Sequence, residues 1–282
     1  MPPRTLLLTA LAMLAFAGNS LLCRLALRET EIDAASFTAL RLASGALMLA
    51  VLLRLRSGSR PMAGSWPGAL ALFTYAAAFS FAYLHLDTGI GALLLFGAVQ
   101  LSMLLWGLWR GERLPALATF GTLLAGGGLL FLLLPGASAP PLSAALLMLL
   151  AGSAWGAYSL LGRGQGDPLA VTAGNFLRAT ALGLLLAVPV FAQLQWDAAG
   201  LFYAVLSGAL TSGIGYAIWY SALPGLRASQ AATVQLSVPI LAALAGSLVL
   251  GEALSLRLML SAVAVLGGIA LVLGSRQPQQ KK

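Results

Sequence analysis

The chain has 282 residues, of which 60% are apolar and only 9% charged, with a formal net charge of +8. So few charged residues could not coat the surface of two soluble domains of this total length. The pI of about 10.4 would suggest nucleic-acid binding in a soluble protein, but the basic residues are scattered singly between apolar runs. The single cysteine, Cys23, excludes intrachain disulfides and sites built on several thiolates. Composition therefore indicates an integral membrane protein in a lipid bilayer, with no nucleic-acid partner.

Apolar runs long enough to cross a bilayer, which takes about 20 residues, recur along the chain with short gaps. The first run imitates a cleavable signal peptide, with Arg4 before it and Ala15-Phe16-Ala17 inside it. We expect it to be retained, because the run continues to Leu27 and has a counterpart within the chain. Proline, glycine and charged residues divide the whole into ten predicted spans, at 5–27, 34–55, 67–86, 89–109, 116–134, 140–162, 169–191, 199–222, 228–250 and 256–274.

The basic residues predict the direction of these spans, because Lys and Arg beside a span tend to stay in the cytoplasm. With the N-terminus inside, only Arg28 and Arg257 lie clearly outside, and most acidic residues fall on the outer side. Both termini are therefore predicted to be cytoplasmic, which needs an even number of spans. The expected location is the inner membrane of a bacterium.

The two halves of the chain resemble each other weakly. Phe16-Ala-Gly-Asn-Ser-Leu-Leu-Cys-Arg24 is echoed by Trp155-Gly-Ala-Tyr-Ser-Leu-Leu-Gly-Arg163, and Gly111-Glu112 is echoed by Gly251-Glu252. We therefore expect a first five-helix repeat at 1–136 and a second at 137–282, which ends in a short cytoplasmic tail. Because five is odd, the second repeat enters the membrane in the opposite direction, as in many secondary transporters.

Four motifs in the second half follow one another in order: Trp155-Gly-Ala-Tyr158, Trp219-Tyr-Ser-Ala-Leu223, Val238-Pro-Ile-Leu-Ala-Ala243 and Leu250-Gly-Glu252. With ten spans in two halves, this order resembles the EamA-type drug/metabolite transporter family over nearly the whole chain. The first half departs from the pattern, since Val99 stands where a proline like Pro239 would be expected.

The resemblance implies an all-α membrane protein of two inverted five-helix repeats. It implies transport of a small organic metabolite by alternating access through a central cavity. Within the family the chain is similar to the YddG type, which implies export of neutral or aromatic amino acids. Export of other metabolites or drugs, or a channel without a carrier cycle, is the alternative.

Aromatic and amide side chains supply the candidate substrate site, because a carrier needs modest polar and aromatic contacts near the middle of the bilayer. Aromatic faces can hold an apolar side chain while hydroxyl and indole N–H groups bind polar atoms. Packing or interface anchoring is the alternative for each aromatic residue. The candidate substrate-binding residues are Asn19, Tyr75, Phe79, Tyr83, Trp155, Tyr158, Tyr216, Trp219 and Gln235.

A second group of residues has either a structural or a coupling role. Arg41 and Arg178 lie deep in predicted spans, where charge is costly, and bonding to helix carbonyls is favoured over binding a substrate carboxylate. His85 could titrate near the outer end of the third span, or form an outer-surface polar pair with Asp87. Gln100 could join helices, and Pro239 could kink the ninth span.

The acidic residues argue against proton coupling, since all eight fall at span ends or in loops and none is expected to be buried. Facilitated diffusion is the simpler expectation. The sequence offers no paired acids, metal-ligand set or activated nucleophile for an intramembrane enzyme, so we expect no catalytic residues, no cofactor and no metal.

Overall fold

The computed structural model describes residues 2–56, 61–136, 139–188, 197–226 and 228–275. Every regular element in these ranges is a helix. The helices are α1 (Pro3–Glu29), α2 (Ala34–Leu55), α3 (Trp66–Tyr83), α4 (Thr88–Trp109), α5 (Ala116–Leu133), α6 (Leu142–Leu161), α7 (Pro168–Ala187), α8 (Ala198–Val205), η2 (Leu206–Ile214), α9 (Gly215–Ala222), η3 (Leu223–Gly225), α10 (Ala228–Gln235), α11 (Ser237–Leu250) and α12 (Leu256–Ser275).

Within the described residues, nine helical segments are long and apolar enough to cross a membrane. The helix α3 occupies the place of the predicted third span but is not among the nine. It also ends at Tyr83, short of the predicted residue 86. Similarly, α7 ends at Ala187, and residues 189–191 of the predicted seventh span lie outside the described part of the chain.

Two predicted spans are interrupted helices. The eighth consists of α8, the π-helical segment η2, α9 and the short η3. The ninth breaks at Leu236, between α10 and α11. Pro239 follows this break and lacks the N–H that would bond to the carbonyl of Gln235 in a continuous helix. By contrast α4, which carries Val99 at the corresponding place, runs unbroken.

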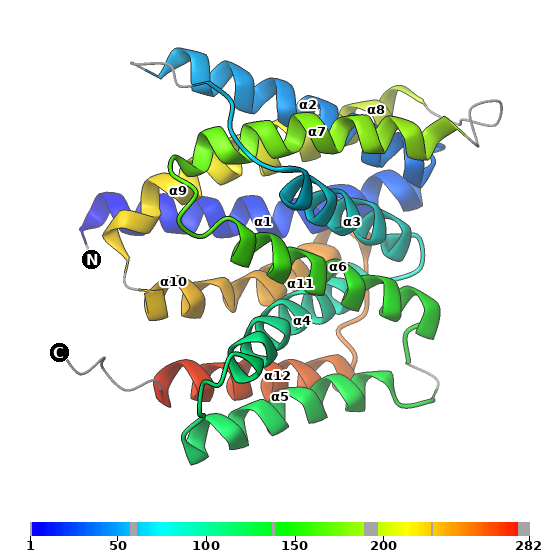
Figure 1. Cartoon of the computed structure of the whole chain (residues 1–282). Helices are drawn as coiled ribbons and strands as arrows, with labels where there is room; N and C mark the ends of the chain where they lie inside the picture. Colours follow the sequence, from blue (N-terminus) through cyan, green and yellow to red (C-terminus); the bar gives the residue numbers. More distant parts are fainter. Residues whose placement is uncertain (1, 57–60, 137–138, 189–196, 227, 276–282) are drawn as a thin grey trace, which may run out of the picture.

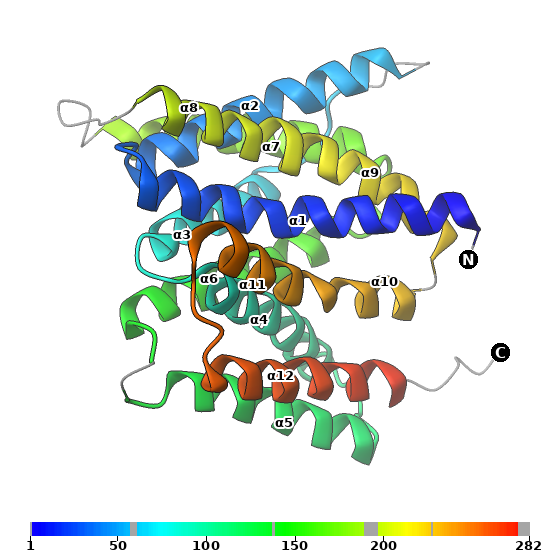
Figure 2. The ribbon, with the colours of Figure 1, turned by 180° about the vertical axis from the view of Figure 1, so that it is seen from behind.

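The helices form a bundle in which α2 and α7 lie along one edge and α5 and α12 along the other (Figures 1 and 2). Between these edges α3 packs on α6, α4 on α6 and α11, and α1 on α11, α9 and η2. The beginning of α1 and the end of α12 lie on the same side of the bundle (Figure 1). The basic residues Arg60 and Arg227 and the tail after Ser275, which entered the topology prediction, lie outside the described residues.

Glycines allow several helix pairs to approach closely, as small residues do in membranes. A Cβ atom on Gly152 of α6 would lie only 2.5 Å from the Leu95 carbonyl oxygen of α4. One turn later, a Cβ on Gly156 would collide with the Ser102 hydroxyl. These contacts place the aromatic end of α6 directly against α4.

The pair of adjacent glycines in α12 provides a test of this packing. We expect Gly268→Val to lower the stability of the detergent-solubilised protein by about 1–3 kcal/mol, because the added atoms would overlap α5. A Cβ at this position would collide with the Gly121 carbonyl oxygen and lie 2.7 Å from the Ala125 nitrogen. Gly267→Val is the matched control, since nothing lies within 4 Å of a Cβ there. Equal thermal unfolding temperatures for the two variants would contradict this packing.

Candidate functional site

A cavity of about 570 Å³ lies within the bundle. Its lining extends from the exposed side chains of Glu112 and Arg163 to Ser20 and Phe79, which are fully buried. Both halves of the chain contribute to it, through α1, α3 and α4 on one side and α6, α9 and α10 on the other. The volume falls within the range of sites for metabolite-sized molecules.

Most of the predicted substrate-binding residues share this lining. They are Asn19, Tyr75, Phe79, Trp155, Tyr158, Tyr216, Trp219 and Gln235, and Gln100 lies with them. The amide nitrogen of Gln235 donates to the Ala231 carbonyl oxygen at 3.2 Å, so this side chain also bonds to its own helix. The structure therefore brings these predicted residues from separate helices together along one cavity, and their role in substrate binding stays a prediction.

The remaining candidates lie elsewhere. Tyr83 is buried outside the lining and donates its hydroxyl to the Thr88 carbonyl oxygen at 3.2 Å. His85 is exposed in the turn after α3, and Pro239 is buried near the start of α11. Arg178 donates to the carbonyl oxygens of Ala63 and Gly174, both at 2.9 Å.

The centre of the cavity wall is a group of aromatic rings around Trp155. Its ring stacks on Tyr216 with centroids 5.4 Å apart and an angle of 17° between the planes. The rings of Tyr75 and Tyr158 lie 4.8 and 5.3 Å from Trp155. Because these rings come from α3, α6 and α9, they bring both halves together in one aromatic surface, in which the Tyr75 ring is tilted by 55° from Trp155. Such a surface can hold an apolar or aromatic group of a solute.

Asn19 joins three helices at the buried end of the cavity. Its side-chain oxygen accepts hydrogen bonds from Ser207 at 2.8 Å and Thr211 at 3.3 Å, and its nitrogen donates to the Tyr75 hydroxyl at 3.4 Å. Ser207 and Thr211 belong to η2, where the π-helical geometry resets the direction of the side chains. The predicted candidates included Asn19 and Tyr75, but hydropathy gave no sign of the π-helical segment beside them.

A second polar chain lies nearer the mouth. The hydroxyl of Tyr158 donates to the Thr172 hydroxyl oxygen at 3.3 Å, and Thr172 and Tyr220 share a hydrogen bond of 2.8 Å. All three residues line the cavity. The tyrosine rings are therefore held at fixed angles by bonds between α6, α7 and α9.

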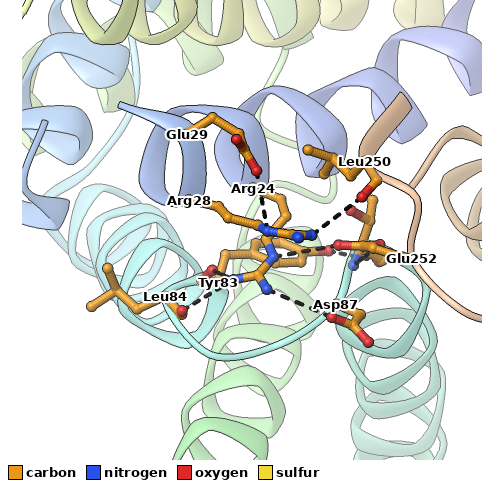
Figure 3. A network of polar contacts seen from close by, with 9 residues as sticks. Arg24, Arg28, Glu29, Tyr83, Leu84, Asp87, Leu250 and Glu252 are labelled. Carbon is orange, nitrogen blue, oxygen red and sulfur yellow. Dashed lines mark hydrogen bonds and ion pairs between the residues drawn. The ribbon is translucent and has the colours of Figure 1, made fainter. Parts of the chain in front are cut away.

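The opposite end of the bundle is closed by a polar network around Arg24 of α1 (Figure 3). Its guanidinium donates to the carbonyl oxygens of Tyr83 and Leu84 at 2.9 and 3.0 Å, which binds α1 to the end of α3. The same group pairs with Glu252 at 3.4 Å and lies 3.6 Å from Asp87. Four segments from both halves of the chain therefore converge on one side chain.

Glu252 corrects the expectation that no carboxylate is buried. It lies in the connection between α11 and α12, as a loop residue should, yet its side chain is only 5% exposed. One oxygen faces Arg24, and the other accepts the Thr88 backbone N–H at 2.8 Å, at the positive N-terminal end of α4. The loop folds back into the bundle because these donors replace water.

The weak repeat gave the only sequence signal for this network. The repeat aligns Arg24 with Arg163 and Glu252 with Glu112. The counterparts Arg163 and Glu112 line the exposed mouth of the cavity. The structure therefore has related Arg and Glu residues at both ends. They are joined at the closed end and solvent-exposed at the open one.

These features define the class of protein: a helical integral membrane protein with a solute-sized cavity that is open at one end and closed at the other. Residues 142–274 match the EamA-like transporter family. The chain is 70% identical over 274 residues to "Uncharacterized protein PA1977" of Pseudomonas aeruginosa, covering 97% of this chain and 96% of that one. It is 27% identical to an "Uncharacterized transporter" of Archaeoglobus fulgidus, covering 96% of this chain and 98% of that one.

A crystal structure with 20% sequence identity has the same fold, with a TM-score of 0.68 over 99% of this chain and 100% of the other. The family match covers just under half of the chain, and together with the archaeal relative it supports a membrane transporter of the drug/metabolite transporter superfamily. The family evidence points to a transporter rather than an enzyme, and it implies a small-molecule substrate.

Proposed function

We propose that the protein exports neutral or aromatic amino acids across a bacterial inner membrane by alternating access. The observation that carries this proposal is the cavity lined by aromatic rings from both halves, exposed at one end and closed at the other by the Arg24 network. An aromatic surface suits an apolar side chain, and the hydroxyl groups around it suit the polar end of an amino acid.

The helix contacts support ten spans in two inverted repeats, with α3 as the third span and boundaries at 1–136 and 137–282. The contact of α3 with α6 matches that of α9 and η2 with α1, and the contact of α4 with α6 matches that of α11 with α1. When each helix is replaced by its counterpart in the other half, the contacts of α2 with α7, α4 with α11 and α5 with α12 map onto themselves. Such symmetry is what two equivalent halves around one site require.

In the proposed orientation both termini are cytoplasmic, so the cavity opens to the cytoplasm and the Arg24 network closes the outer face. The beginning of α1 and the end of α12 lie on the same side as the α4–α5 and α6–α7 connections, which contain the exposed Glu112 and Arg163, and this agrees with the distribution of basic residues (Figure 1). Efflux driven by a high internal solute concentration is the proposed direction.

The test of this function is counterflow in proteoliposomes. Vesicles preloaded with unlabelled phenylalanine or leucine are expected to accumulate the labelled amino acid transiently, which a carrier produces and a channel does not. Preloading with sugars or cationic drugs serves as the comparison. Exchange of these solutes but not of amino acids would contradict the proposed substrate, and equilibration without counterflow would contradict the carrier cycle.

Alternating access also predicts that Glu112 and Arg163 approach each other when the mouth closes, as Arg24 and Glu252 do in the closed outer end. We expect a Glu112→Cys, Arg163→Cys double variant in a Cys23→Ser background to lose most counterflow after treatment with a short thiol cross-linker. Each single variant, treated in the same way, should retain it. Full activity of the cross-linked double variant would show that the mouth does not close at these residues.

A further inference from the structure

A buried positive charge with an unused donor lies next to the deep end of the cavity, against two of the lining residues. Arg41 of α2 is only 2% exposed, and its guanidinium carbon lies 4.8 and 5.2 Å from the ring centroids of Phe79 and Tyr75. One terminal nitrogen, Nη2, donates to the Tyr75 hydroxyl oxygen at 2.9 Å. The other, Nη1, is buried and has no hydrogen-bond partner among the described residues.

The other two arginines within the bundle are compensated differently. Arg24 faces the carboxylates of Glu252 and Asp87, and Arg178 donates to two backbone carbonyl oxygens. Arg41 contacts a neutral phenol and two aromatic faces instead. A buried charge without an opposite charge is costly in a membrane protein and marks a binding or transport site.

The Tyr75 hydroxyl, which bonds to Arg41, offers a further hydrogen-bond donor to the cavity. Its oxygen accepts hydrogen bonds from Arg41 and Asn19, so its own hydrogen is left to donate. The nearby acceptor, the Asn19 side-chain oxygen, already accepts from Ser207 and Thr211. Among the described lining residues, the only carboxylate is that of Glu112, at the exposed mouth. The deep end therefore offers a hydrogen-bond donor, with the positive charge of Arg41 beside it.

We propose that the transported solute carries a carboxylate, which binds at the Tyr75 hydroxyl with Arg41 as its counter-charge. This inference rests on the transporter function proposed above and adds the charge of the recognised group. The phenol hydrogen can donate to one carboxylate oxygen, while the guanidinium that donates to the same phenol oxygen supplies the opposite charge. The rest of the solute then lies on the aromatic surface around Trp155, where a ring or an ammonium group is favourably placed.

Two probes of nearly equal shape test this charge preference: 3-phenylpropanoate and its neutral amide, 3-phenylpropanamide. We expect the carboxylate to inhibit counterflow, and to stabilise the purified protein against thermal unfolding, at concentrations at least about tenfold lower than the amide, as hydrogen bonds to a charged group imply. Equal potency of the two probes on the unaltered protein would overturn the inference.

Variants locate the preference at the proposed residues. Tyr75→Phe and Arg41→Gln should each reduce the ratio of carboxylate to amide potency by about tenfold. Arg178→Gln removes a partly buried cation that donates to carbonyl oxygens and lies outside the cavity lining, so its ratio should stay unchanged. An unchanged ratio in Tyr75→Phe would overturn the assignment, and this conservative variant retains the ring contacts if Arg41→Gln does not fold.

Failure of this inference is distinguishable from failure of the proposed function. Counterflow of a neutral solute with no carboxylate preference would be consistent with the carrier function and would contradict the role of Arg41 as a counter-charge to a carboxylate. Absence of counterflow for every solute, together with a clear carboxylate preference in thermal unfolding, would retain the binding site and contradict the transport cycle.

Discussion

Replacing Glu252 by glutamine is expected to shift the protein away from the conformation with a closed outer end. Loss of the carboxylate charge leaves Arg24 with its two carbonyl partners and the more distant Asp87. Removal of one partner from a buried ion pair typically costs about 3–5 kcal/mol. Because Asp87 remains, we expect about 2 kcal/mol, which changes the ratio of the two conformations roughly 30-fold.

Labelling of a cysteine at the buried end of the cavity measures this shift. Ser20 is 1% exposed and lines the cavity, so Ser20→Cys in a Cys23→Ser background should resist an impermeant maleimide added from outside. The added Glu252→Gln change should make the same cysteine reactive from that side and lower the thermal unfolding temperature.

The control for this variant is Glu29→Gln, which removes the exposed ion pair of Arg28 and Glu29 near the same face. Exposed pairs contribute about 0–1 kcal/mol, so labelling should stay slow. Reactivity that is the same in the Glu252 and Glu29 variants would mean that the buried network does not hold the outer end closed.

Most helix positions could be predicted because lipid leaves the backbone little choice. Each spanning segment must satisfy its own hydrogen bonds, so apolar runs bounded by Gly, Pro and charge give spans directly. The helix α2 has the predicted bounds, and α12 differs from its predicted span by one residue. Pro239 was the only sequence signal for the helix break at Leu236. The π-helical segment was not foreseeable, because its hydropathy is that of an ordinary helix.

The candidate site was predictable in its residue types but not in its depth. Tyr75, Phe79 and Tyr83 share one helix face by spacing, and the structure lines the cavity with the first two only. Tyr83 lies one turn further, where the helix ends and the Thr88 carbonyl accepts its hydroxyl. Spacing along a helix indicates which face a side chain is on. Whether that side chain reaches the cavity depends on the residues packed around it at its position along the helix.

Charged contacts between the halves depended entirely on tertiary packing. Arg24 and Glu252 are separated by 228 positions in the chain, and nothing local to either residue indicates the pairing. Likewise Arg41 and Arg178 occupy corresponding positions in sequence, yet one contacts a phenol and the other contacts carbonyls. The repeat therefore predicted where charges lie and could not predict which partner each one finds.

Trp155→Ala is expected to reduce counterflow by about tenfold or more while leaving membrane insertion intact. The indole contacts Tyr75, Tyr158 and Tyr216 at once, and its removal takes away the surface on which the solute would lie. Loss of aromatic contacts worth about 1–2 kcal/mol would raise the half-saturation concentration by that factor. Trp155→Phe should recover part of the activity, since a smaller ring preserves a flat apolar face.

The matched control is Trp109→Ala, which removes the same side chain from a position 75% exposed and outside the cavity lining. Its counterflow should match that of the unaltered protein. If both alanine variants transport normally, Trp155 does not contact the solute. If Trp155→Ala lowers the maximal rate but not the half-saturation concentration, the indole acts on the conformational step through its contact with Tyr75 of the first half, and the binding surface lies elsewhere among the rings.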